Sequence, residues 1–441
     1  MQNRQDEENK IRALIDKYQS VRQASIEMCR PLSAPEYRLQ PIEDVSPPWW
    51  NLAHTTWFYA LNILRPLGLD VPFTAEYQYK LNSYYHYQGP MLERGRRGLQ
   101  LRPENEEIFN YRNQVDEQMI RLLRDSTDRP DRGQDNLAFL TTVGVNHEQQ
   151  HQELFYTEIK QIYFADARPD LLRYPPALMP EESPPADTRS RFLPVDGGGF
   201  EFGNLEDNWG WDNEYGIHRR HIEDFSIMDR LVTNAEFLEF IQDNGYGQIL
   251  LWLSNGWYEK EKQGWHAPLY WEQRNGEWWN YTLAGWRPLA LEEPVCHLSF
   301  YEADAFAKWK AHNSADRRIR LATEYEWEQA ARTLAEPIES GNFIEDHRYH
   351  VIGARSNTTG RVHQMFGDVW EWTASHYEPY PRFQPFPGGL VEYNGKFMDN
   401  QRVLRGGSWA TPRDHIRISY RNFWQPATRF QCTGIRLAMD S

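Results

Sequence analysis

The sequence predicts two domains of different classes, a helical bundle followed by an α+β domain. Three observations support this. The first 165 or so residues carry apolar positions at helical spacing, a Pro-rich segment follows, and the remainder has short apolar runs among many Gly, Trp and Asn residues. The chain has 441 residues, well above a typical domain of about 150. We expect the bundle over residues 1–165, a linker over 166–190 and the α+β domain over 191–441.

The N-terminal segment is expected to form four long helices. Apolar residues in its first part recur every three or four positions, as one face of a helix requires. Before the second helix, Ser46 offers a capping hydroxyl, and Pro47 and Pro48 need no N–H acceptor there. Four such helices with connections between them indicate a four-helix bundle. The predicted helices span residues 6–29, 49–64, 104–125 and 134–163.

The rest of the chain differs in its composition and in the pattern of its apolar residues. Prolines crowd residues 166–190, which predicts a linker or an extended strap. Beyond this segment the short apolar runs are typical of an α+β unit with much irregular loop. Helices are expected there at residues 233–243, 300–312 and 323–333.

The charge balance argues against a nucleic-acid partner. Lysine and arginine number 48 and aspartate and glutamate 63, which gives a net charge of −15. A nucleic-acid-binding protein usually carries a basic patch. The densest basic cluster here, Arg94, Arg96 and Arg97, is short and suits a small anion better than a phosphate backbone.

Cysteine usage and hydropathy indicate a cytoplasmic protein without a membrane segment. Cys29, Cys296 and Cys432 are too few and too scattered for a disulfide framework, which fits a reducing compartment. No stretch approaches about 18 consecutive apolar residues. The first ten residues are polar and acidic, unlike a secretion signal.

A pair of histidines on the fourth predicted helix is the central chemical signal. His147 and His151 are four residues apart, so both imidazoles lie on one helical face and can reach one ion. His54, on the second predicted helix, offers a third donor, and facing helices of a bundle often combine such donors. Glu153 is two residues beyond His151 and points away, so we interpret it as a supporting group.

The residue types leave the metal open. Three neutral imidazoles suit zinc, iron(II), copper or nickel, whereas calcium prefers oxygen donors. Zinc would support hydrolysis through a bound water, and iron would support oxygen chemistry through open coordination positions. The alternative without a metal is that His147 and His151 share a helical face by chance and that His54 is an ordinary buried core residue.

The N-terminal segment resembles the DinB-like domain of the ergothioneine-pathway sulfoxide synthases. The resemblance rests on residues 46–58 (SPPWWNLAHTTWF) and on the motif of His147, His151 and Glu153. Residues 81–85 (LNSYY), followed by Gly89-Pro90 and residues 97–99 (RGL), resemble the substrate loop of the same family.

The C-terminal segment resembles the formylglycine-generating-enzyme, or sulfatase-modifying-factor, fold, which is a C-type-lectin-like unit. It lacks the paired cysteines that formylglycine-generating enzymes use for copper, which argues against sulfatase activation. The two domains in this order cover nearly the whole chain. The matching motifs are residues 230–234 (RLVTN), 294–297 (PVCH), 321–324 (LATE), 367–372 (GDVWEW), 403–409 (VLRGGSW) and 434–438 (GIRLA).

The resemblance implies an oxygen-dependent enzyme that contains mononuclear iron(II). The family joins a thiol to C2 of the imidazole of hercynine, which is trimethylhistidine, and the product is a sulfoxide. Its iron ligands match His54, His147 and His151, and the glutamine that binds the substrate imidazole matches Gln150. The segment that holds the trimethylammonium group matches Asn422, Phe423 and Trp424; aromatic faces suit a quaternary ammonium.

The resemblance also implies roles in thiol binding and proton transfer. Arg94 and Arg97 match the basic positions that bind the carboxylate of the thiol substrate, cysteine or γ-glutamylcysteine. A catalytic tyrosine matches Tyr84 or Tyr85, which would give a proton or a hydrogen atom during the oxygen chemistry. A second pair of candidates, Tyr377 and Tyr380, follows the GDVWEW motif, where another branch keeps its catalytic tyrosine.

Two departures from the family pattern keep alternatives open. The loop of residues 86–96 (HYQGPMLERGR), together with the basic run that follows it, is closer to the ovothiol-pathway synthases, which couple cysteine to unmethylated histidine. Asp368 replaces the usual asparagine of its motif, which we interpret as a structural change. A selenium analogue of the reaction is related, and a zinc-dependent DinB-like thiol transferase or a non-catalytic binding protein are rivals from other classes.

Overall fold

The computed structural model describes residues 2–69, 71, 74–101, 103–128, 134–166, 173–174, 190–205, 208–314, 318–354 and 360–441. The chain divides into two compact units, Met1–Ala167 and Arg168–Ser441. Each unit is described by itself below. Most of the Pro-rich segment at residues 166–190 lies outside the described residues.

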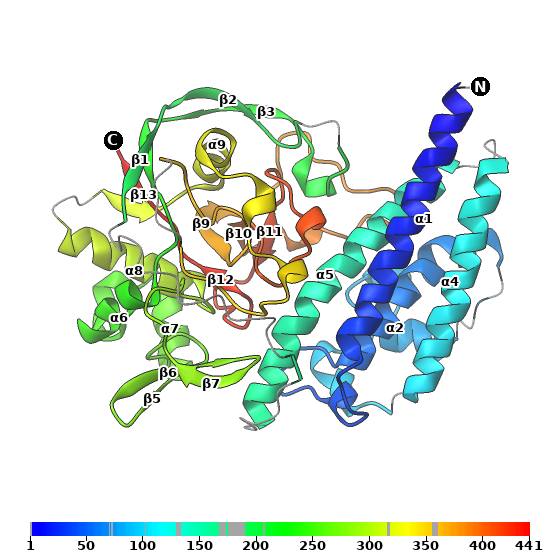
Figure 1. The fold of residues 1–441 in the computed structure, drawn as a ribbon, viewed down its shortest axis with the longest axis horizontal. Helices are drawn as coiled ribbons and strands as arrows, with labels where there is room; N and C mark the ends of the chain where they lie inside the picture. The colour runs from blue at the N-terminus through cyan, green and yellow to red at the C-terminus, as the bar shows by residue number, and fades with distance from the viewer. Residues whose placement is uncertain are drawn as a thin grey trace. The chain divides into compact units, whose positions relative to one another are not determined.

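The N-terminal unit contains the four long helices that the sequence predicts. The second helix continues into a π-helical turn, Ala60–Leu64. A short additional helix, α3 (Ala75–Leu81), follows in the connection to the third long helix. Helices α1, α2, α4 and α5 run side by side in Figure 1, and contacts join α2 to each of the other three. The long helices are α1 (Gln2–Cys29), α2 (Pro48–Tyr59), α4 (Asn105–Asp128) and α5 (Gln134–Asp166).

Helix α2 lies at the centre of this unit. All twelve of its residues are buried. Trp49, Trp50 and Trp57 are each at most 1% exposed, which places three large rings in the core. A helix that is buried on every side must be surrounded by other parts of the protein, and α2 contacts α1, α4 and α5. The burial of α2 therefore fixes the place of His54, which is 0% exposed.

The expected role of Ser46 as the cap of α2 is wrong. The N-cap residue is Pro47, and no side chain caps the helix. The Ser46 hydroxyl instead accepts a hydrogen bond from Nη1 of Arg97 at 2.9 Å. A buried guanidinium without an acceptor is costly, and this demand outweighs the smaller gain from helix capping.

A buried ion-pair cluster holds three of the long helices together. Glu148 on α5 accepts hydrogen bonds from Nη1 of Arg22 at 2.9 Å, from Arg112 and from the Ser25 hydroxyl at 2.6 Å. Burial would raise the pKa of Glu148, but Arg112 and Arg22 outweigh that effect and lower it to about 2. These helices are therefore fixed around the residue that follows His147.

The described residues of the C-terminal unit form four small sheets. One has the order β1 (Phe192–Val195), β4 (Phe225–Met228), β13 (Leu437–Asp440) and β8 (Ile319–Leu321), all antiparallel. A second has the order β11 (Asn422–Trp424), β10 (Arg402–Arg405), β9 (Trp370–His376) and β12 (Thr433–Gly434), with only β12 parallel to its neighbour. The others are the hairpin of β2 (Gly198–Phe202) and β3 (His218–Ile222), and the meander of β5 (Trp271–Arg274), β6 (Glu277–Thr282) and β7 (Gly285–Pro288).

The three helices predicted in this unit are present, and each begins with a capping box. They are α6 (Asn234–Gln242), α8 (Phe300–Asn313) and α9 (Glu324–Leu334). A fourth helix, α7 (Ser254–Gln263), was not expected from the sequence. Its first turn contains Asn255 and Gly256, which are typical of a turn, and no side chain caps it.

The GDVWEW motif leads into β9 and is built around a buried carboxylate. Asp368 adopts a left-handed backbone with φ of 57°, a conformation that Asn and Asp tolerate better than other non-glycine residues. One of its oxygens accepts hydrogen bonds from the Asn342 amide at 2.8 Å and from the Ile352 backbone at 3.0 Å. Through these contacts Asp368 links its own loop to the loops of Asn342 and Ile352, which is a structural role.

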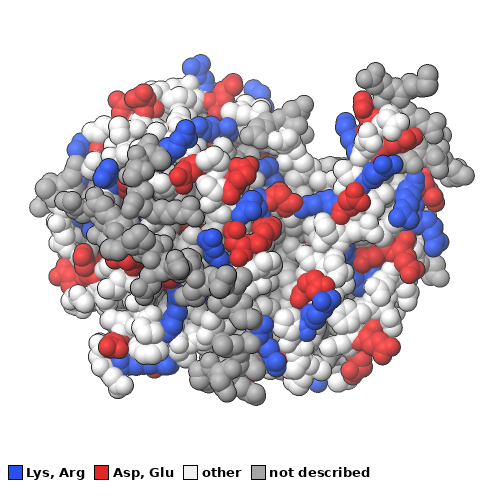
Figure 2. All heavy atoms as spheres, viewed as in Figure 1, with Lys and Arg blue, Asp and Glu red and all other residues white. Residues whose placement is uncertain are grey.

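The described surface mixes both signs of charge. Basic and acidic side chains are interspersed over the described part of the face drawn in Figure 2. No described helix has both the length and the apolar character that a bilayer crossing requires.

Candidate metal centre

Three imidazoles converge inside the N-terminal unit. Helix α2 contributes His54, and α5 contributes His147 and His151. Nε2 of His147 lies 3.3 Å from Nε2 of His54 and 3.2 Å from Nε2 of His151. One ligand atom from each of the three lies within 4.8 Å of the others. Two residues one turn apart on α5 thus face a third on the central helix.

Backbone and side-chain acceptors fix the tautomers of two of these rings. Nδ1 of His54 lies 2.6 Å from the Leu81 carbonyl, which can only accept a hydrogen bond. His54 therefore carries its proton on Nδ1 and presents a lone pair at Nε2. Nδ1 of His151 lies 2.9 Å from Oδ1 of Asn51, whose amide nitrogen is committed elsewhere. His151 consequently also presents an Nε2 lone pair.

Burial keeps the three rings neutral. It lowers the pKa of His147 to about 3. Burial, and then the neighbouring His147, hold the pKa of His54 well below its ordinary value. The pKa of His151 is lowered by burial first, and then by the other two histidines. At neutral pH the cluster is therefore a set of three uncharged nitrogen donors.

The cluster fits a metal ion. Metal–nitrogen bonds of about 2.0–2.1 Å at tetrahedral or octahedral angles separate neighbouring nitrogens by about 2.9–3.4 Å. The two measured separations, 3.2 and 3.3 Å, lie in that range. Lone pairs of His54 and His151 both face Nε2 of His147, whose single proton could satisfy only one of them. A cation between the three nitrogens accounts for the arrangement.

A chain of hydrogen bonds supports the cluster on the side of His151. The Asn51 amide nitrogen donates to Oε2 of Glu158 at 2.5 Å, and the Ser46 backbone N–H donates to Oε1 at 2.8 Å. Burial raises the pKa of Glu158 to about 7, although these hydrogen bonds lower it. Such outer partners orient metal-binding imidazoles and tune their basicity.

An aromatic stack supports the cluster on the side of His54. The Trp50 ring stacks on His54 with centroids 4.4 Å apart and an interplanar angle of 10°. The Arg97 guanidinium lies 3.5 Å from the centroid of the Trp50 ring. Burial and the neighbouring Arg94 lower the pKa of Arg97 to about 9, so the group remains charged at neutral pH. This stack places a cation close to the three imidazoles.

The two arginines expected to bind the thiol differ in their surroundings. Arg97 is 3% exposed and bonds to Ser46 through Nη1. Arg94 is half-buried and donates to the Asp44 carbonyl. The Nε atoms of both are buried without a hydrogen-bond partner among the described residues. Each guanidinium therefore keeps an Nε–H donor that has no acceptor among the described residues.

The remaining residues expected on α5 lie as helical spacing requires. Gln150 is half-buried and three residues from His147, so it shares that face of the helix. Glu153 is 7% exposed and is not a member of the donor cluster found among the described residues.

Tyr84 and Tyr85 lie in the loop that follows α3. Their rings stack with centroids 4.5 Å apart, and their hydroxyls are 3.3 Å apart. Tyr85 is 1% exposed, and its ring is 6.2 Å from Trp57, which stacks on His54 at 5.5 Å. Tyr84 is half-buried. The loop follows Leu81, the last residue of α3, whose carbonyl accepts from His54, so the tyrosine pair and the imidazole share one support.

The residues expected to hold the trimethylammonium group lie on β11 of the C-terminal unit. Asn422, Phe423 and Trp424 are all half-buried. Phe423 stacks on Tyr377 with centroids 4.1 Å apart and an angle of 13°. The strand therefore presents aromatic rings that are partly accessible.

The second pair of tyrosine candidates is engaged within the same unit. The Tyr377 hydroxyl accepts a hydrogen bond from the Asn213 amide at 2.7 Å. The Tyr380 hydroxyl donates to Oε2 of Glu324 at 3.1 Å. Burial raises the pKa of both tyrosines well above the ordinary value.

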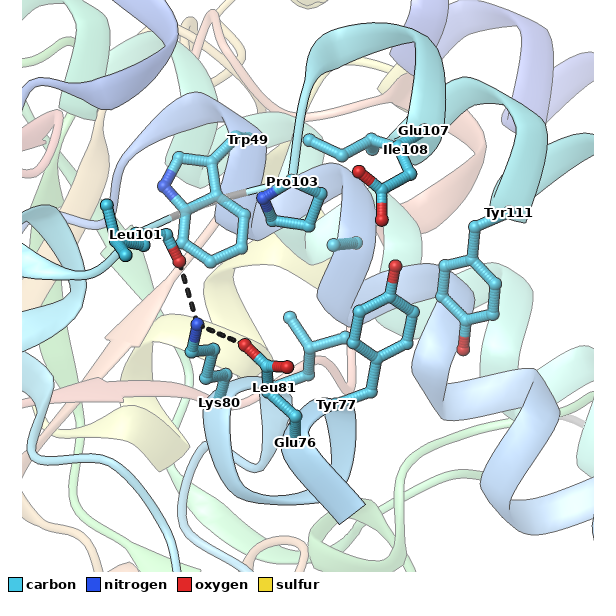
Figure 3. Close-up of a pocket in the computed structure, with 11 residues that line it drawn as sticks. Trp49, Glu76, Tyr77, Lys80, Leu81, Leu101, Pro103, Glu107, Ile108 and Tyr111 are labelled. Atoms are coloured by element: carbon cyan, nitrogen blue, oxygen red, sulfur yellow. Dashed lines mark hydrogen bonds and ion pairs between the residues drawn. The ribbon is translucent and has the colours of Figure 1, made fainter. Parts of the chain in front are cut away.

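A separate pocket opens on another side of α2 (Figure 3). Lys80 bridges its edge, with Nζ 2.6 Å from Oε1 of Glu76 and 2.7 Å from the Leu101 carbonyl. Leu81 is among its lining residues, and the three histidines are not. The pocket is thus lined by the residue whose carbonyl orients His54, but not by the imidazole cluster itself.

Most of the residues that support the three-histidine cluster were not expected from the sequence. Asn51 is one turn before His54, and Glu158 is seven residues, or two turns, after His151. Both therefore share a helical face with a histidine, and that spacing could have singled them out. No spacing links Trp50 to Arg97, because they come together only through the fold.

Comparison with known proteins agrees with this architecture. Residues 17–155 match the DinB superfamily, and residues 179–441 match the Sulfatase-modifying factor enzyme 1-like domain. The hercynine oxygenase of Mycolicibacterium smegmatis is 33% identical over 329 residues, 70% of this chain and 73% of that protein. That of Mycolicibacterium thermoresistibile is 33% identical over 341 residues, 72% of each chain. Ergothioneine biosynthesis protein 1 of Schizosaccharomyces pombe is 27% identical over 245 residues, 53% of this chain and 28% of that protein.

These matches and the fold define a two-domain enzyme, an oxygenase that joins a DinB-type bundle to a sulfatase-modifying-factor domain. The chain belongs to the hercynine oxygenase family. The family resemblance that the sequence suggested, and the fold class expected from it, are therefore confirmed.

Proposed function

We propose that this oxygenase forms a carbon–sulfur bond between C2 of the imidazole ring of hercynine and the sulfur of a thiol, with cysteine as the preferred thiol. One O2 is consumed. One of its oxygen atoms enters the sulfoxide and the other leaves as water, together with the thiol hydrogen and the C2 hydrogen. The four electrons that reduce O2 come from the new carbon–sulfur bond and from oxidation of the sulfur.

The observation that carries the proposal is the set of converging imidazole lone pairs in a member of this family. His54 and His151 are fixed as Nδ1-protonated tautomers, so that their Nε2 atoms face His147. We propose that the three Nε2 atoms hold iron(II). When bound, iron would supply the activation of O2, which zinc does not supply.

The protein residues would bind and orient the two substrates. We propose that Gln150 donates to or accepts from the hercynine imidazole, since it shares a helical face with His147. Asn422, Phe423 and Trp424 would contact the trimethylammonium group. That group has no N–H donor, and aromatic faces attract such a cation by about 0.5–2 kcal/mol each.

Arg94 and Arg97 are proposed to bind the thiol substrate through its carboxylate. Both have a buried Nε without a partner among the described residues. A guanidinium fork matches a carboxylate in geometry and charge. A charged group stacked on Trp50, beside His54, would also favour the thiolate form of the thiol.

Tyr84 or Tyr85 is proposed as the proton donor during oxygen reduction. Their hydroxyls are 3.3 Å apart, so a proton lost by one can be replaced from the other. The half-buried Tyr84 faces solvent more than Tyr85 does, which gives the pair a route for reprotonation.

The test combines metal loading with product analysis. The full chain is freed of metal, loaded anaerobically with Fe2+ or Zn2+, and supplied with hercynine, cysteine and O2. We expect a sulfoxide, identified by mass spectrometry, and an equal amount of O2 consumed in the iron-loaded sample only. Thiol transfer in the zinc-loaded sample without O2 uptake would overturn the proposal.

Parallel substrate arms distinguish the alternative reactions. Histidine in place of hercynine tests ovothiol-type coupling, which the loop of residues 86–96 favours. γ-Glutamylcysteine and a selenol test the other partners. A higher kcat/KM for histidine than for hercynine would contradict hercynine as the acceptor while leaving the iron and oxygen chemistry in place.

A further inference from the structure

A second cluster of metal-binding residue types lies in the C-terminal unit. Cys296, His297 and Cys432 each place a ligand atom within 4.8 Å of the others. All three are buried, at 8%, 4% and 0% exposure. The two cysteines belong to distant parts of the sequence, so the fold alone brings them together. Neither the oxygenase reaction nor the three-histidine cluster involves these residues.

Three segments are fixed around this cluster by hydrogen bonds. The His297 backbone N–H donates to the Thr433 carbonyl at 2.9 Å, and the Leu269 N–H donates to the His297 carbonyl at 3.2 Å. The Thr433 hydroxyl donates to the Leu298 carbonyl at 2.6 Å. Thr433 begins β12, which pairs with β9 in the second sheet (Figure 1). The donors are therefore preorganised.

The backbone at the cluster is strained in a way that aims side chains into it. His297 has φ of 68° and Tyr270 has φ of 76°. Residues other than glycine adopt such left-handed conformations only at a cost in conformational energy. The two rings pack edge to face with centroids 4.7 Å apart. The left-handed backbone of His297 thus belongs to the arrangement that brings its imidazole to the two thiols.

We propose that Cys296, His297 and Cys432 form a second metal site, which binds zinc. Two cysteine sulfurs and an imidazole are three of the four donors that zinc usually takes in proteins. Two thiolates and a divalent ion sum to zero charge, whereas a monovalent copper ion would leave a net negative charge in a buried place. The ion would link the strand segment around Thr433 to the loop of residues 294–298.

The test uses cobalt(II) as a spectroscopic substitute for zinc in the reduced, metal-free full chain. A sulfur–cobalt bond gives a charge-transfer absorption that a site made only of imidazoles cannot give, so the absorption reports on this site even though the three-histidine cluster also takes up cobalt. We expect the absorption to reach its maximum by two equivalents of cobalt and to disappear when Zn2+ is added. Its absence from the folded wild-type chain would overturn the proposal.

Variants tie the signal to these residues. Cys296→Ser and Cys432→Ser should each remove or strongly weaken the absorption, while Cys29→Ser, which alters a buried cysteine of the other unit, should leave it unchanged. An unchanged signal in both of the first two variants contradicts the site. Titration of thiols in the denatured, unreduced protein should find three; a single free thiol would indicate a Cys296–Cys432 disulfide and overturn the proposal.

If the cysteine variants fail to fold, the variant His297→Asn tests the proposed zinc site instead. Asparagine adopts the left-handed backbone of residue 297 readily, so His297→Asn removes the imidazole without added strain. We expect the sulfur–cobalt absorption to remain and the affinity for Zn2+ to fall about 10-fold or more. An affinity equal to that of the wild-type chain would exclude His297 as a ligand and contradict the proposed site.

Discussion

Asn51 joins His151 to Glu158. Its Oδ1 lies 2.9 Å from Nδ1 of His151, and its Nδ2 lies 2.5 Å from Oε2 of Glu158. Because the Asn51 amide nitrogen donates to Glu158, its Oδ1 faces His151, and this assigns the proton of His151 to Nδ1. A residue one helical turn from one proposed metal ligand, His54, thereby orients another, His151, on a different helix.

Asn51→Ala should therefore weaken metal binding without removing a ligand. Loss of an outer hydrogen-bond partner typically costs about 10–100-fold in metal affinity, and we expect a loss of that size for Fe2+. Competitive titration against a chelator measures it. Asn62→Ala is the matched control, because Asn62 lies just beyond α2 and donates to the Phe58 carbonyl at 2.9 Å. Equal affinities in Asn51→Ala and wild type would show that this contact does not orient the site.

Tyr84→Phe and Tyr85→Phe should separate carbon–sulfur bond formation from thiol oxidation. Each removes a hydroxyl of the stacked pair and retains the ring. We expect one of them to shift the product from the sulfoxide towards cysteine sulfinic acid, because the proton that directs the reaction is lost. Quantifying both products per O2 consumed is the measurement. If both variants keep the wild-type ratio, neither tyrosine has the proposed role, and Tyr377→Phe becomes the next test.

Arg97→Lys should raise KM for the thiol more than it lowers kcat. A lysine retains the charge but loses both the fork that binds a carboxylate and the flat contact with Trp50. We expect an increase in KM of about 10-fold, equivalent to about 1.4 kcal/mol. Arg96→Lys is the control, since Arg96 is exposed. A loss confined to kcat, with unchanged thiol KM, would assign Arg97 to support of Trp50 and His54 instead.

Glu148→Gln should destabilise the bundle strongly. The substitution leaves Arg22 and Arg112, at 2% and 0% exposure, without their shared counter-ion. Removing one partner from a buried ion pair costs about 3–5 kcal/mol, which urea unfolding of the full chain would measure. Glu27→Gln is the control, because its ion pair with Arg30 is exposed.

The same residue should make stability depend on acid pH. The pKa of Glu148 is about 2 in the folded chain and about 4.3 when unfolded. Its stabilising contribution is therefore complete above about pH 4.3 and is lost as the pH falls towards 2. The difference in unfolding free energy between wild type and Glu148→Gln should shrink over that window. A constant difference would contradict the assignment.

The sequence predicted the parts of this account that depend on local spacing. The spacing of His147 and His151 placed both imidazoles on one face of a helix. The helical spacing of the first 165 or so residues and the Pro-rich segment after them predicted two domains, and the family motifs identified the fold of each. These signals lie in short stretches of sequence and do not require knowledge of the tertiary structure.

Other features depend on contacts between distant residues. The Ser46 hydroxyl accepts from Arg97 because folding buries the guanidinium beside it. Cys296 and Cys432 seemed scattered in the sequence and meet only where β12 approaches the loop of residues 294–298. Helix α7 was missed because its polar first turn is typical of a loop, although packing buries Gly256 against Tyr301.

The most direct measurement of the central claim is oxygen uptake by the iron-loaded chain in parallel with its His147→Ala variant. With Fe2+, hercynine and cysteine, the wild-type chain should bind one iron at the three-histidine site and form sulfoxide in step with O2 consumption. The variant, which lacks the nitrogen that both other histidines face, should lose both. Equal O2-coupled turnover by the folded variant, or turnover by the wild-type chain with zinc and no O2, would contradict a tri-imidazole iron centre.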